Sequence, residues 1–548
     1  MSLGKDFFNS YSAYKNFFNI NCSHTGSNSW VVSGEKSGSG KPILANDVHL
    51  GFQAPSKWYE VHLKSKDVDV SGMSIPGAPA VVIGHNKFIA WGVTNLMNDD
   101  TDFFILESDS SDYLKYKYQN QSYFLDSLVE KISVKDSAEI NFTIKYTKTG
   151  PVISELKSNF QEQNANKNKL LTFKWTGFEI SDEFYALYKI NIARNWDEFK
   201  SGLKDFGVPA QNFIYADVNG NIGYHAAGKI PVRKTNIYSD FIFPSAGEPD
   251  WISFIDFDKL PNVFNPKEGL IVTANTNPFD WLKSDEKNRY YISYIWETSS
   301  RFDKIRGTLM KKANLNLSEF KLLQMNYESL YAKEISKFVI AAFKDYKIND
   351  SRVISILDEF KNWNGEMNAD ESIGAVYSSF FIELLKNIYL DELGEKIFQD
   401  FLNVGNLPLR AAHILLNRAD SGWFDDVNTS NIETRDEIIR KSFLGAVEFL
   451  KTKYNNSAVN SWRWGEIHKV KFKHPMGIVP ALERTFNIGP YEVGGDQTTV
   501  NNSEYGFYEA YKYGEFDNTL GPSMRMIVDL SDIRHSYSVN TTGQSGQP

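Results

Sequence analysis

The apolar pattern of this 548-residue chain changes twice, and the order of the changes limits the folds open to it. From residue 30 to about 235, short apolar runs alternate with Gly, Asn and Asp turns, which is typical of strands. From about 298 to 454 the apolar residues recur at helical spacing, and strand composition returns from about 462 to 529. This order predicts one α+β unit whose sheets receive strands from both ends of the chain. A separate helical domain near 303–460 is the alternative.

Local signals place several elements within this pattern. The runs 213–218 and 221–224 flank Asn219-Gly220 and predict a hairpin, whose type I′ turn needs positive φ at both residues. Helices are predicted over 301–312, 328–347, 351–363, 372–390 and 434–454. Several of them begin at Ser or Thr, which are preferred as helix caps.

Composition argues against several classes of protein. The net charge is −9, and basic residues are interspersed with acidic ones without forming a basic stripe, so nucleic acid is not an expected partner. No apolar run approaches the length of a membrane span, and the first residues lack the long apolar stretch of a signal peptide. The single cysteine, Cys22, rules out an intrachain disulfide framework. None of these features predicts a compartment.

Ser27 follows a glycine just before the strand pattern begins. If the Gly26–Ser27 bond is cut, Ser27 carries a hydroxyl and a free α-amino group on one residue. The α-amine has an unperturbed pKa of about 7.7–8.0. Near neutral pH it can therefore take a proton from that hydroxyl, directly or through a water. Gly-Ser-Asn-Ser is also ordinary turn composition, which is the alternative interpretation.

Other catalytic or binding signatures are absent or incomplete. The segment 34–41 resembles a phosphate loop, but Pro42 stands where Ser or Thr should coordinate magnesium, so a hairpin turn is expected there. Neither an H-E-x-x-H sequence nor a paired Cys/His set supports zinc chemistry. The chain also lacks the G-x-S-x-G elbow of an α/β-hydrolase.

A series of short motifs follows Gly26 in a fixed order. The series comprises Gly26-Ser27-Asn28-Ser29-Trp30, Asn46-Asp47-Val48-His49-Leu50, Gly84-His85-Asn86, Trp91-Gly92-Val93-Thr94-Asn95, Asn98-Asp99-Asp100-Thr101-Asp102, Ala274-Asn275-Thr276-Asn277-Pro278, Arg301 and Gly494-Gly495-Asp496. By these motifs, residues 27–548 resemble the catalytic chain of the penicillin acylase family of N-terminal-nucleophile (Ntn) amidohydrolases. The resemblance implies an αββα sandwich of two antiparallel sheets between helical layers, with a long helical insertion at about 303–460. It also makes residues 1–26 a leader or spacer remnant upstream of a self-cleavage point.

The chemistry that the resemblance implies is centred on Ser27. In this family a precursor cuts itself before the catalytic serine, so the Ser27 hydroxyl would attack the Gly26 carbonyl and the resulting ester would hydrolyse. The mature serine would then attack a substrate amide and form an acyl-enzyme that water releases. By the same correspondence, the Asn277 side chain and the backbone N–H of Asn95 donate to the oxyanion. For Asn277 the alternative is a turn asparagine before Pro278.

Two further positions correspond to residues that hold the catalytic groups. His49 stands where the family has a residue that orients the nucleophile and its amine, and its alternative is a solvated loop histidine. Arg301 matches an arginine that holds the amine and the oxyanion asparagine, and its alternative is an exposed arginine in the first turn of a helix.

A short acidic segment corresponds to the calcium site of some family members, through Asp99, Thr101 and Asp102. Clustered carboxylate and carbonyl oxygens suit such a hard cation. Two ligands are not matched, because an aspartate expected within 285–291 falls on or near Tyr290 and another ligand belongs to a separate chain. One bound calcium ion and a solvated acidic loop are therefore the two interpretations. No organic cofactor is implied.

Leu50, Ile83 and Val93 correspond to positions of the acyl pocket, and their alternative is ordinary core packing. The first two are aliphatic where penicillin G acylases have aromatic residues, which points to an aliphatic or a different aryl acyl group.

The predicted function is hydrolysis of the side-chain amide of penicillin-type β-lactams or related N-acyl small molecules. The resemblance implies a second, small α chain from the same precursor as partner. The alternatives are an N-acyl-homoserine lactone or cephalosporin acylase of the same family, or a non-catalytic binding protein with the same sandwich. Family members are often periplasmic or secreted.

Overall fold

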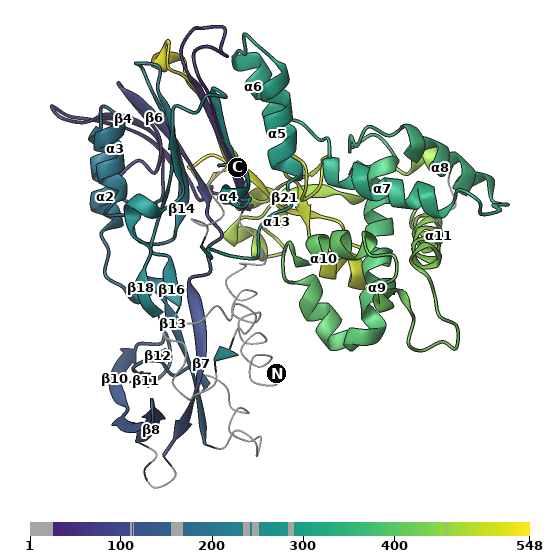
Figure 1. Ribbon diagram of the computed structural model, residues 1–548, viewed down its shortest axis with the longest axis horizontal. Coiled ribbons are helices and arrows are strands. Elements are labelled where there is room, and N and C mark those ends of the chain that lie inside the picture. The colour runs from purple at the N-terminus through teal and green to yellow at the C-terminus, as the bar shows by residue number, and fades with distance from the viewer. Residues whose placement is uncertain are drawn as a thin grey trace.

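The computed structural model describes residues 26–109, 112, 114–154, 168–233, 242–243, 251–282, 290–455 and 458–547. Of the predicted leader, only Gly26 falls within these residues. The two ends of the described chain meet in one large sheet (Figure 1).

Strand β1, which carries Ser27, lies inside this first sheet. The strand order is β20 (Leu270–Thr273), β1 (Gly26–Val32), β2 (Ile43–Gly51), β24 (Asn518–Asp529), β21 (Lys469–Phe472) and β22 (Ile488–Glu492), with β23 (Glu504–Tyr505) and β25 (Tyr537–Asn540) also paired to β24. The pairs are antiparallel except for β21 with β24. The pairing of β2 with β24 confirms that the sheet receives strands from both ends of the chain.

A second, antiparallel sheet packs against the first. Its order is β19 (Asn262–Phe264), β15 (Ile222–Ala227), β14 (Gln211–Asp217), β6 (Ile89–Asn95), β5 (Ile83–Asn86), β4 (Asp69–Ser74) and β3 (Tyr59–Lys64). Val31 and Leu44 of the first sheet share one buried core with Trp91 and Ile214 of the second. Most residues of the central strands β1, β6 and β14 are buried, because helices cover the outer faces.

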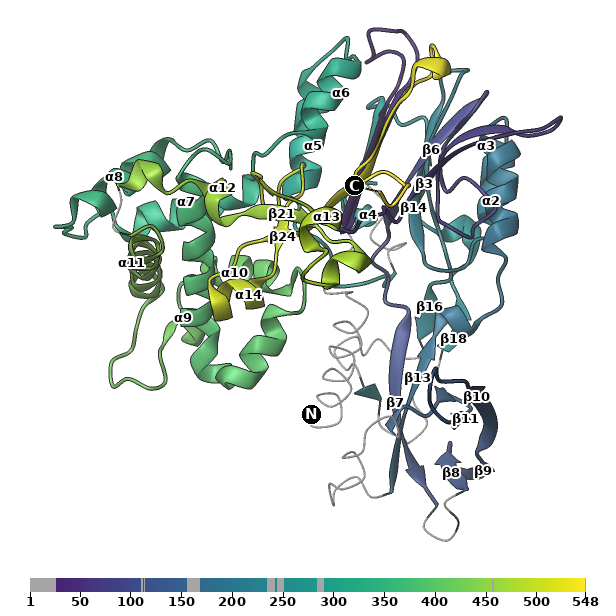
Figure 2. The same ribbon diagram turned by 180° about the vertical axis from the view of Figure 1, so that it is seen from behind.

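Helices form the two outer layers (Figures 1 and 2). Helices α2 (Glu183–Ile192) and α3 (Trp196–Leu203) pack on the second sheet through residues such as Leu187 and Phe199. Helices α5 (Ser300–Lys311) and α6 (Leu317–Gln324) pack on the first sheet, where Ile305 and Phe320 contact the cluster around Trp30. The predicted αββα sandwich is confirmed.

The helical region forms a lobe beside the sandwich, at the right of Figure 1. Its helices are α7 (Leu330–Ala342), α8 (Ser351–Asn362), α9 (Ile373–Leu402), α10 (Leu407–Leu416) and α11 (Arg435–Lys453), joined by α12 (Trp464–Ile467) and α14 (Phe507–Tyr513) around a common core. The starts predicted for α7, α8, α9 and α11 agree with the observed starts within two residues. Ser329 caps α7 and Thr434 caps α11. Helix α9 continues past the predicted end at 390, with a break at Gly394, whose φ is +68°.

Smaller sheets extend away from the sandwich, at the bottom of Figures 1 and 2. One contains β13 (Lys169–Trp175), β7 (Thr101–Ser108), β8 (Lys115–Tyr118) and β9 (Gln121–Phe124), with β17 (Ile242–Phe243) parallel to β7. A three-stranded sheet contains β10 (Asp126–Ile132), β11 (Ile140–Thr147) and β12 (Gly150–Pro151). A two-stranded sheet contains β16 (Pro231–Arg233) and β18 (Trp251–Phe254). Two further α-helices of the described chain are short, α4 (Pro278–Trp281) and α13 (Glu483–Phe486).

The predicted hairpin forms, but its turn differs from the expectation. Strand β14 pairs with β15 up to Ala216 and Ile222, and only Gly220 of the Asn-Gly pair has a positive φ, of +105°. The carboxylate of Asp217 accepts from the backbone N–H groups of Asn219 and Asn221 at 2.9 and 3.0 Å. An aspartate-centred loop therefore replaces the type I′ turn.

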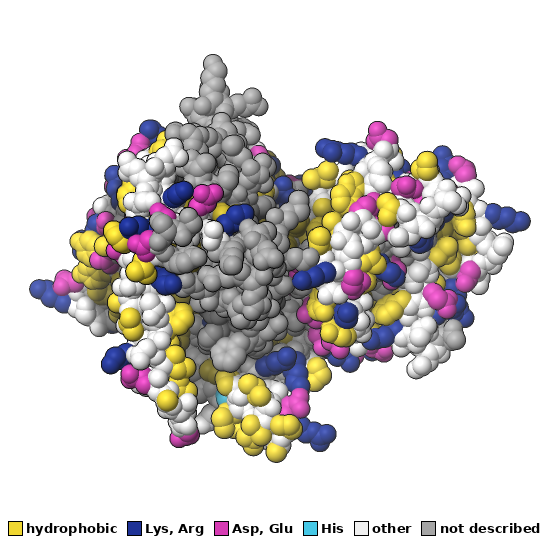
Figure 3. Space-filling view, turned by 90° about the horizontal axis from the view of Figure 1, so that it is seen from below, with side chains coloured by type: hydrophobic (Ala, Val, Ile, Leu, Met, Phe, Trp, Pro, Cys, Tyr) yellow, Lys and Arg dark blue, Asp and Glu magenta, His cyan; other side chains and the backbone are white. Residues whose placement is uncertain are grey.

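On the face shown in Figure 3, basic and acidic side chains are interspersed among hydrophobic ones. Within the described ranges, none of the helices is both long and apolar enough to cross a bilayer.

Candidate active site

Ser27 is the second residue of β1 and only 4% exposed. Its hydroxyl donates to the carbonyl oxygen of Gly26, and its backbone N–H donates to Oδ1 of Asn275 at 2.7 Å. The hydroxyl therefore lies against the peptide bond that it is predicted to attack. The nitrogen that cleavage would turn into an α-amine already faces a hydrogen-bond acceptor.

Asn275 connects three of the predicted catalytic residues. It follows β20 with a φ of +62°, a region that asparagine adopts more readily than most residues, and its side chain is fully buried. Besides accepting from Ser27, its Oδ1 accepts from the Arg301 guanidinium at 3.1 Å. Its Nδ2 donates to the backbone oxygen of Asn95 at 3.0 Å. One carboxamide thus holds the nucleophile, a cation and the end of β6 together.

The structure places Asn277 differently from the expectation. Its Oδ1 accepts from the N–H of Phe279 at 3.1 Å and caps α4, while its Nδ2 donates to Asp280 at 3.4 Å. Pro278 is the first residue of that helix, a position that favours proline and leaves the preceding asparagine as the cap. The side chain of Asn277 thus forms the turn contacts that its alternative describes, and Asn275 lies beside Ser27. Donation from Asn277 to an oxyanion stays a prediction. Asn-Thr-Asn-Pro offered both residues, and only the capping preference separates them.

Asn95 ends β6 and lies beside the nucleophile through its backbone. Its carbonyl oxygen accepts from Asn275 and, at 3.2 Å, from Nδ2 of Asn212. The Oδ1 of Asn212 in turn accepts from the hydroxyl of Tyr224 at 2.7 Å. The backbone of Asn95 is thus fixed between two amides. Donation from its N–H to an oxyanion stays a prediction.

Arg301 lies in the first turn of α5 and is 1% exposed, so the exposed alternative does not hold. Its guanidinium donates to the carbonyl oxygen of Ser27 at 3.0 Å and to Oδ1 of Asn28 at 2.6 Å. Glu297 lies one turn earlier, with its carboxylate 3.7 Å from the guanidinium. The structure therefore places a paired positive charge directly beside Ser27.

His49 is fully buried on β2, which excludes the solvated-loop alternative. Its Nε2 lies 3.3 Å from Nδ2 of Asn28 and 3.4 Å from the carboxylate of Asp47. Burial is the largest effect and lowers the pKa of His49, although Asp47 acts in the opposite direction. Burial raises the pKa of Asp47, but the charge of Arg525 and the hydrogen bonds with His49 and Arg525 act against burial, and the pKa of Asp47 is lowered. The arrangement favours a neutral imidazole beside an ionised carboxylate.

The other ring nitrogen of His49 faces the predicted cleavage point. Nδ1 is buried and has no hydrogen-bond partner among the described residues. A Cβ placed on Gly26 would lie 3.2 Å from this nitrogen, which is tighter than ordinary packing. Glycine at position 26 therefore lets the chain pass close to the imidazole.

The three predicted pocket residues lie in the sandwich core. Ile83 is fully buried and Val93 is 8% exposed, and Leu50 packs against the same cluster with part of its surface accessible. This packing agrees with the core alternative. Their contact with an acyl group stays a prediction.

The predicted calcium residues surround a guanidinium. Arg233 donates to both carboxylate oxygens of Asp102, at 2.8 and 3.1 Å, and lies 3.3 Å from the carboxylate of Asp99. Thr101 instead donates to Asp100 at 3.0 Å. No group of three or more His, Cys, Asp or Glu side chains suited to a metal ion comes together in the described part of the chain. The described residues do not fit a calcium ion, because a cation already occupies the space between the two carboxylates.

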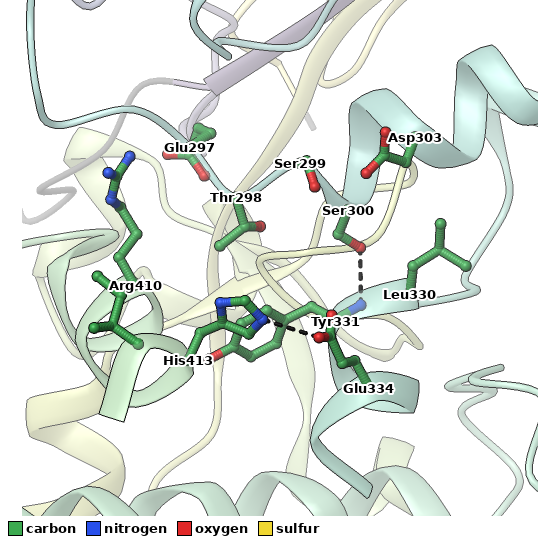
Figure 4. Close-up of a pocket in the computed structure, with 11 residues that line it drawn as sticks. Glu297, Thr298, Ser299, Ser300, Asp303, Leu330, Tyr331, Glu334, Arg410 and His413 are labelled. Atoms are coloured by element: carbon green, nitrogen blue, oxygen red, sulfur yellow. Dashed lines mark hydrogen bonds and ion pairs between the residues drawn. The ribbon is translucent and has the colours of Figure 1, made fainter. Parts of the chain in front are cut away.

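A polar cavity of about 260 Å³ lies next to this centre, with Glu297 in its wall (Figure 4). The backbone N–H of Glu297 donates to the carbonyl oxygen of Asn275 at 3.1 Å, so the cavity begins one contact away from that residue. Glu297 and Arg410 lie at one end and Asp303 and Glu334 at the other (Figure 4). Arg410 donates to the backbone oxygen of Trp296 at 3.0 Å. The cavity thus offers both charges to a ligand.

The penicillin amidase family model matches residues 3–548 of the chain. The chain belongs to the penicillin amidase family. It is 27% identical over 556 residues to the acyl-homoserine lactone acylase QuiP of Pseudomonas aeruginosa, covering 95% of this chain and 64% of that acylase. It is 29% identical over 298 residues to the penicillin G acylase of Escherichia coli, covering 54% of this chain and 34% of that enzyme.

A solved structure has the same fold. The thermostable penicillin G acylase of Alcaligenes faecalis superposes with a TM-score of 0.72 at 19% identity, covering 95% of this chain and 91% of that chain. The likeness supports the Ntn-hydrolase sandwich. The chain spans 63–64% of the length of the acyl-homoserine lactone acylases that it matches.

Proposed function

We propose that this protein hydrolyses the amide bond of N-acylated small molecules through an acyl-enzyme on Ser27. The observation that carries the proposal is the contact of the Ser27 nitrogen with Asn275, at 2.7 Å, next to the buried Arg301. A nucleophile, its own nitrogen, an amide donor and a fixed cation converge there, and acyl transfer uses such groups.

Maturation is the first step of the proposed chemistry. The Ser27 hydroxyl attacks the carbonyl carbon of Gly26, the C–N bond breaks, and the nitrogen leaves as an amine with the hydroxyl proton. Water then hydrolyses the ester, which leaves a carboxylate on Gly26 and a free amino group on Ser27. In the precursor the hydroxyl already contacts the Gly26 carbonyl oxygen, which supports this route.

Catalysis repeats the same chemistry on a substrate. The Ser27 oxygen attacks the amide carbonyl while the α-amine takes its proton and passes it to the leaving amine. The side-chain N–H of Asn275 and the backbone N–H of Asn95 donate to the oxyanion, and water releases the acyl group. Arg301 lies beside Ser27 and would disfavour a protonated α-amine, so the amine would be unprotonated near neutral pH and able to accept the hydroxyl proton.

Two classes of N-acylated small molecule are candidates for the substrate. Penicillin-type β-lactams are our first proposal, with the small α chain of the same precursor as partner. N-acyl-homoserine lactones are the second, because acyl-homoserine lactone acylases match 95% of this chain. The cavity beside Glu297 supports either class, since its size suits a small leaving group.

The test is mass spectrometry of the chain expressed together with the proposed small chain. We expect a mature N-terminus at Ser27, and release of the free acid from penicillins or from acyl-homoserine lactones of varied chain length. A Gly26–Ser27 bond that stays intact in the folded complex, without hydrolysis of either class, would support the non-catalytic alternative.

A further inference from the structure

Arg233 forms a closed cluster with the loop that leaves the active site. Its side chain is 4% exposed, and that of Asp102 is 6% exposed. Beyond its contacts with the carboxylates of Asp102 and Asp99, it donates to the backbone oxygen of Asp99 at 3.2 Å. Burial disfavours the guanidinium charge, but the hydrogen bonds that Arg233 donates to Asp102 and the charges of both aspartates outweigh burial and raise the pKa of Arg233.

Further donors complete the cluster. The hydroxyl of Tyr291 donates to Asp99 at 2.9 Å, and the indole N–H of Trp251 donates to Asp102 at 2.5 Å. Both carboxylate oxygens of each aspartate thus lie against N–H or O–H groups. A divalent ion needs lone pairs directed at it, and here they are directed at protons.

The cluster fixes residues that lead into the catalytic centre. Asp99 lies four residues after Asn95, and its backbone N–H donates to the carbonyl oxygen of Ile292 at 2.8 Å. Five residues after Ile292 comes Glu297, which contacts both Asn275 and Arg301. A shift of this loop would therefore reach the Ser27 site from two sides.

We propose that Arg233 is a built-in cation that replaces a bound metal ion at this loop. Its fixed charge neutralises the two carboxylates and cross-links β16 to Asp99, which lies between β6 and β7, and to Asp102 of β7. The protein then needs no divalent ion for this cross-link. Without the guanidinium, the two adjacent carboxylates are able to bind a divalent ion. The inference rests on the Arg233 contacts and not on the proposed chemistry of Ser27.

The experiment compares the wild type with Arg233→Ala and Arg233→Lys after removal of metals by a chelator. The probes are Tb³⁺, whose luminescence a nearby tryptophan such as Trp251 sensitises, and Ca²⁺ as its competitor. We expect no saturable Tb³⁺ signal from this site in the wild type or in Arg233→Lys, and no change of Tm with 1 mM Ca²⁺. For Arg233→Ala we expect a Tm lower by about 5 °C, because two buried carboxylates lose their partner.

In Arg233→Ala, Ca²⁺ should reverse at least about half of the decrease in Tm. The Tb³⁺ luminescence of this variant should be about ten times the wild-type background. Asp102→Asn in the Arg233→Ala background should remove that signal, which assigns it to this site. Two results would overturn the proposal. The first is a saturable wild-type Tb³⁺ signal that Ca²⁺ displaces and Asp102→Asn abolishes. The second is a folded Arg233→Ala protein with unchanged Tm and no Tb³⁺ binding. The first result can be measured even if Arg233→Ala fails to fold, because it compares the wild type with Asp102→Asn.

Discussion

Replacement of Asn275 by aspartate tests which of two neighbouring asparagines serves catalysis. The change keeps the shape of the side chain, an acceptor for the Ser27 nitrogen, and a residue that tolerates the φ of +62°. Alanine would confound the result, because a positive φ costs it about 1–2 kcal/mol. What aspartate removes is the N–H that reaches Asn95 and, by our proposal, the oxyanion.

The size of the effect follows from these contacts. Loss of one oxyanion donor typically lowers kcat by about 10²–10³, or about 2.7–4 kcal/mol. The Asn95 oxygen keeps its bond from Asn212 at 3.2 Å, and the new carboxylate lies beside Arg301, so the loss of stability should be small. We therefore expect kcat to fall at least about 100-fold, with a Tm close to that of the wild type.

Asn277→Asp is the matched control, since it makes the same chemical change two residues away. Aspartate caps helices as well as asparagine does, so α4 should be retained and kcat should stay within about twofold of the wild-type value. The assay is single-turnover hydrolysis of a chromogenic N-acyl amide, normalised to the fraction of chains that mass spectrometry finds beginning at Ser27. The reasoning is refuted if Asn275→Asp retains near-normal kcat while Asn277→Asp loses it.

Three further changes test other parts of the argument. Ser27→Ala should abolish both cleavage and hydrolysis, whereas Ser27→Cys should retain some cleavage because a thiol is a competent nucleophile, as intact mass would show. Gly26→Ala should slow cleavage, because its Cβ would lie 3.2 Å from His49; a wild-type rate would contradict the close approach. Burial lowers the pKa of His468 to about 4 from its ordinary 6.5, so the unfolded chain binds the extra proton between these values. Stability should therefore be full above pH 6.5 and fall by about 3 kcal/mol toward pH 4. Urea unfolding of His468→Gln should show a flatter dependence on pH in this range, and an unchanged slope would contradict the assignment.

Much of the fold could be predicted from the sequence because periodicity and turn residues act locally. The switch between strand and helical spacing predicted one α+β unit that takes strands from both ends of the chain, and the start of α11 followed from its cap at Thr434. The hairpin at Asn219-Gly220 was placed correctly, but its turn type was wrong. The carboxylate of Asp217 competes for the backbone N–H groups there, and dipeptide preference does not include that competition.

The site was harder to predict because its contacts cross the fold. Ser27 and Asn275 are 248 residues apart, and in the sequence only the capping preference before Pro278 separates Asn275 from Asn277. The same limit applies to Asp99 and Asp102, whose spacing suits a metal. Their partner Arg233 lies 131 residues beyond Asp102 and enters only through the pairing of β16 with β18. The order of the motifs indicated which segments form the candidate site. Long-range strand pairing determines which side chains of those segments are in contact.

The charges around Ser27 support the base that we propose for this buried centre. Arg301 and Arg525 both lower the pKa of His49, and carboxylates at Glu297 and Asp47 accompany the two guanidiniums. Each buried charge therefore has a partner, which its burial requires. The guanidinium of Arg301 contacts the carbonyl oxygen of Ser27 itself, so in our proposal its charge disfavours protonation of the α-amine, as it does for the imidazole. In the mature protein that we propose, an amine kept unprotonated beside a neutral imidazole is available to take the proton of the hydroxyl near neutral pH.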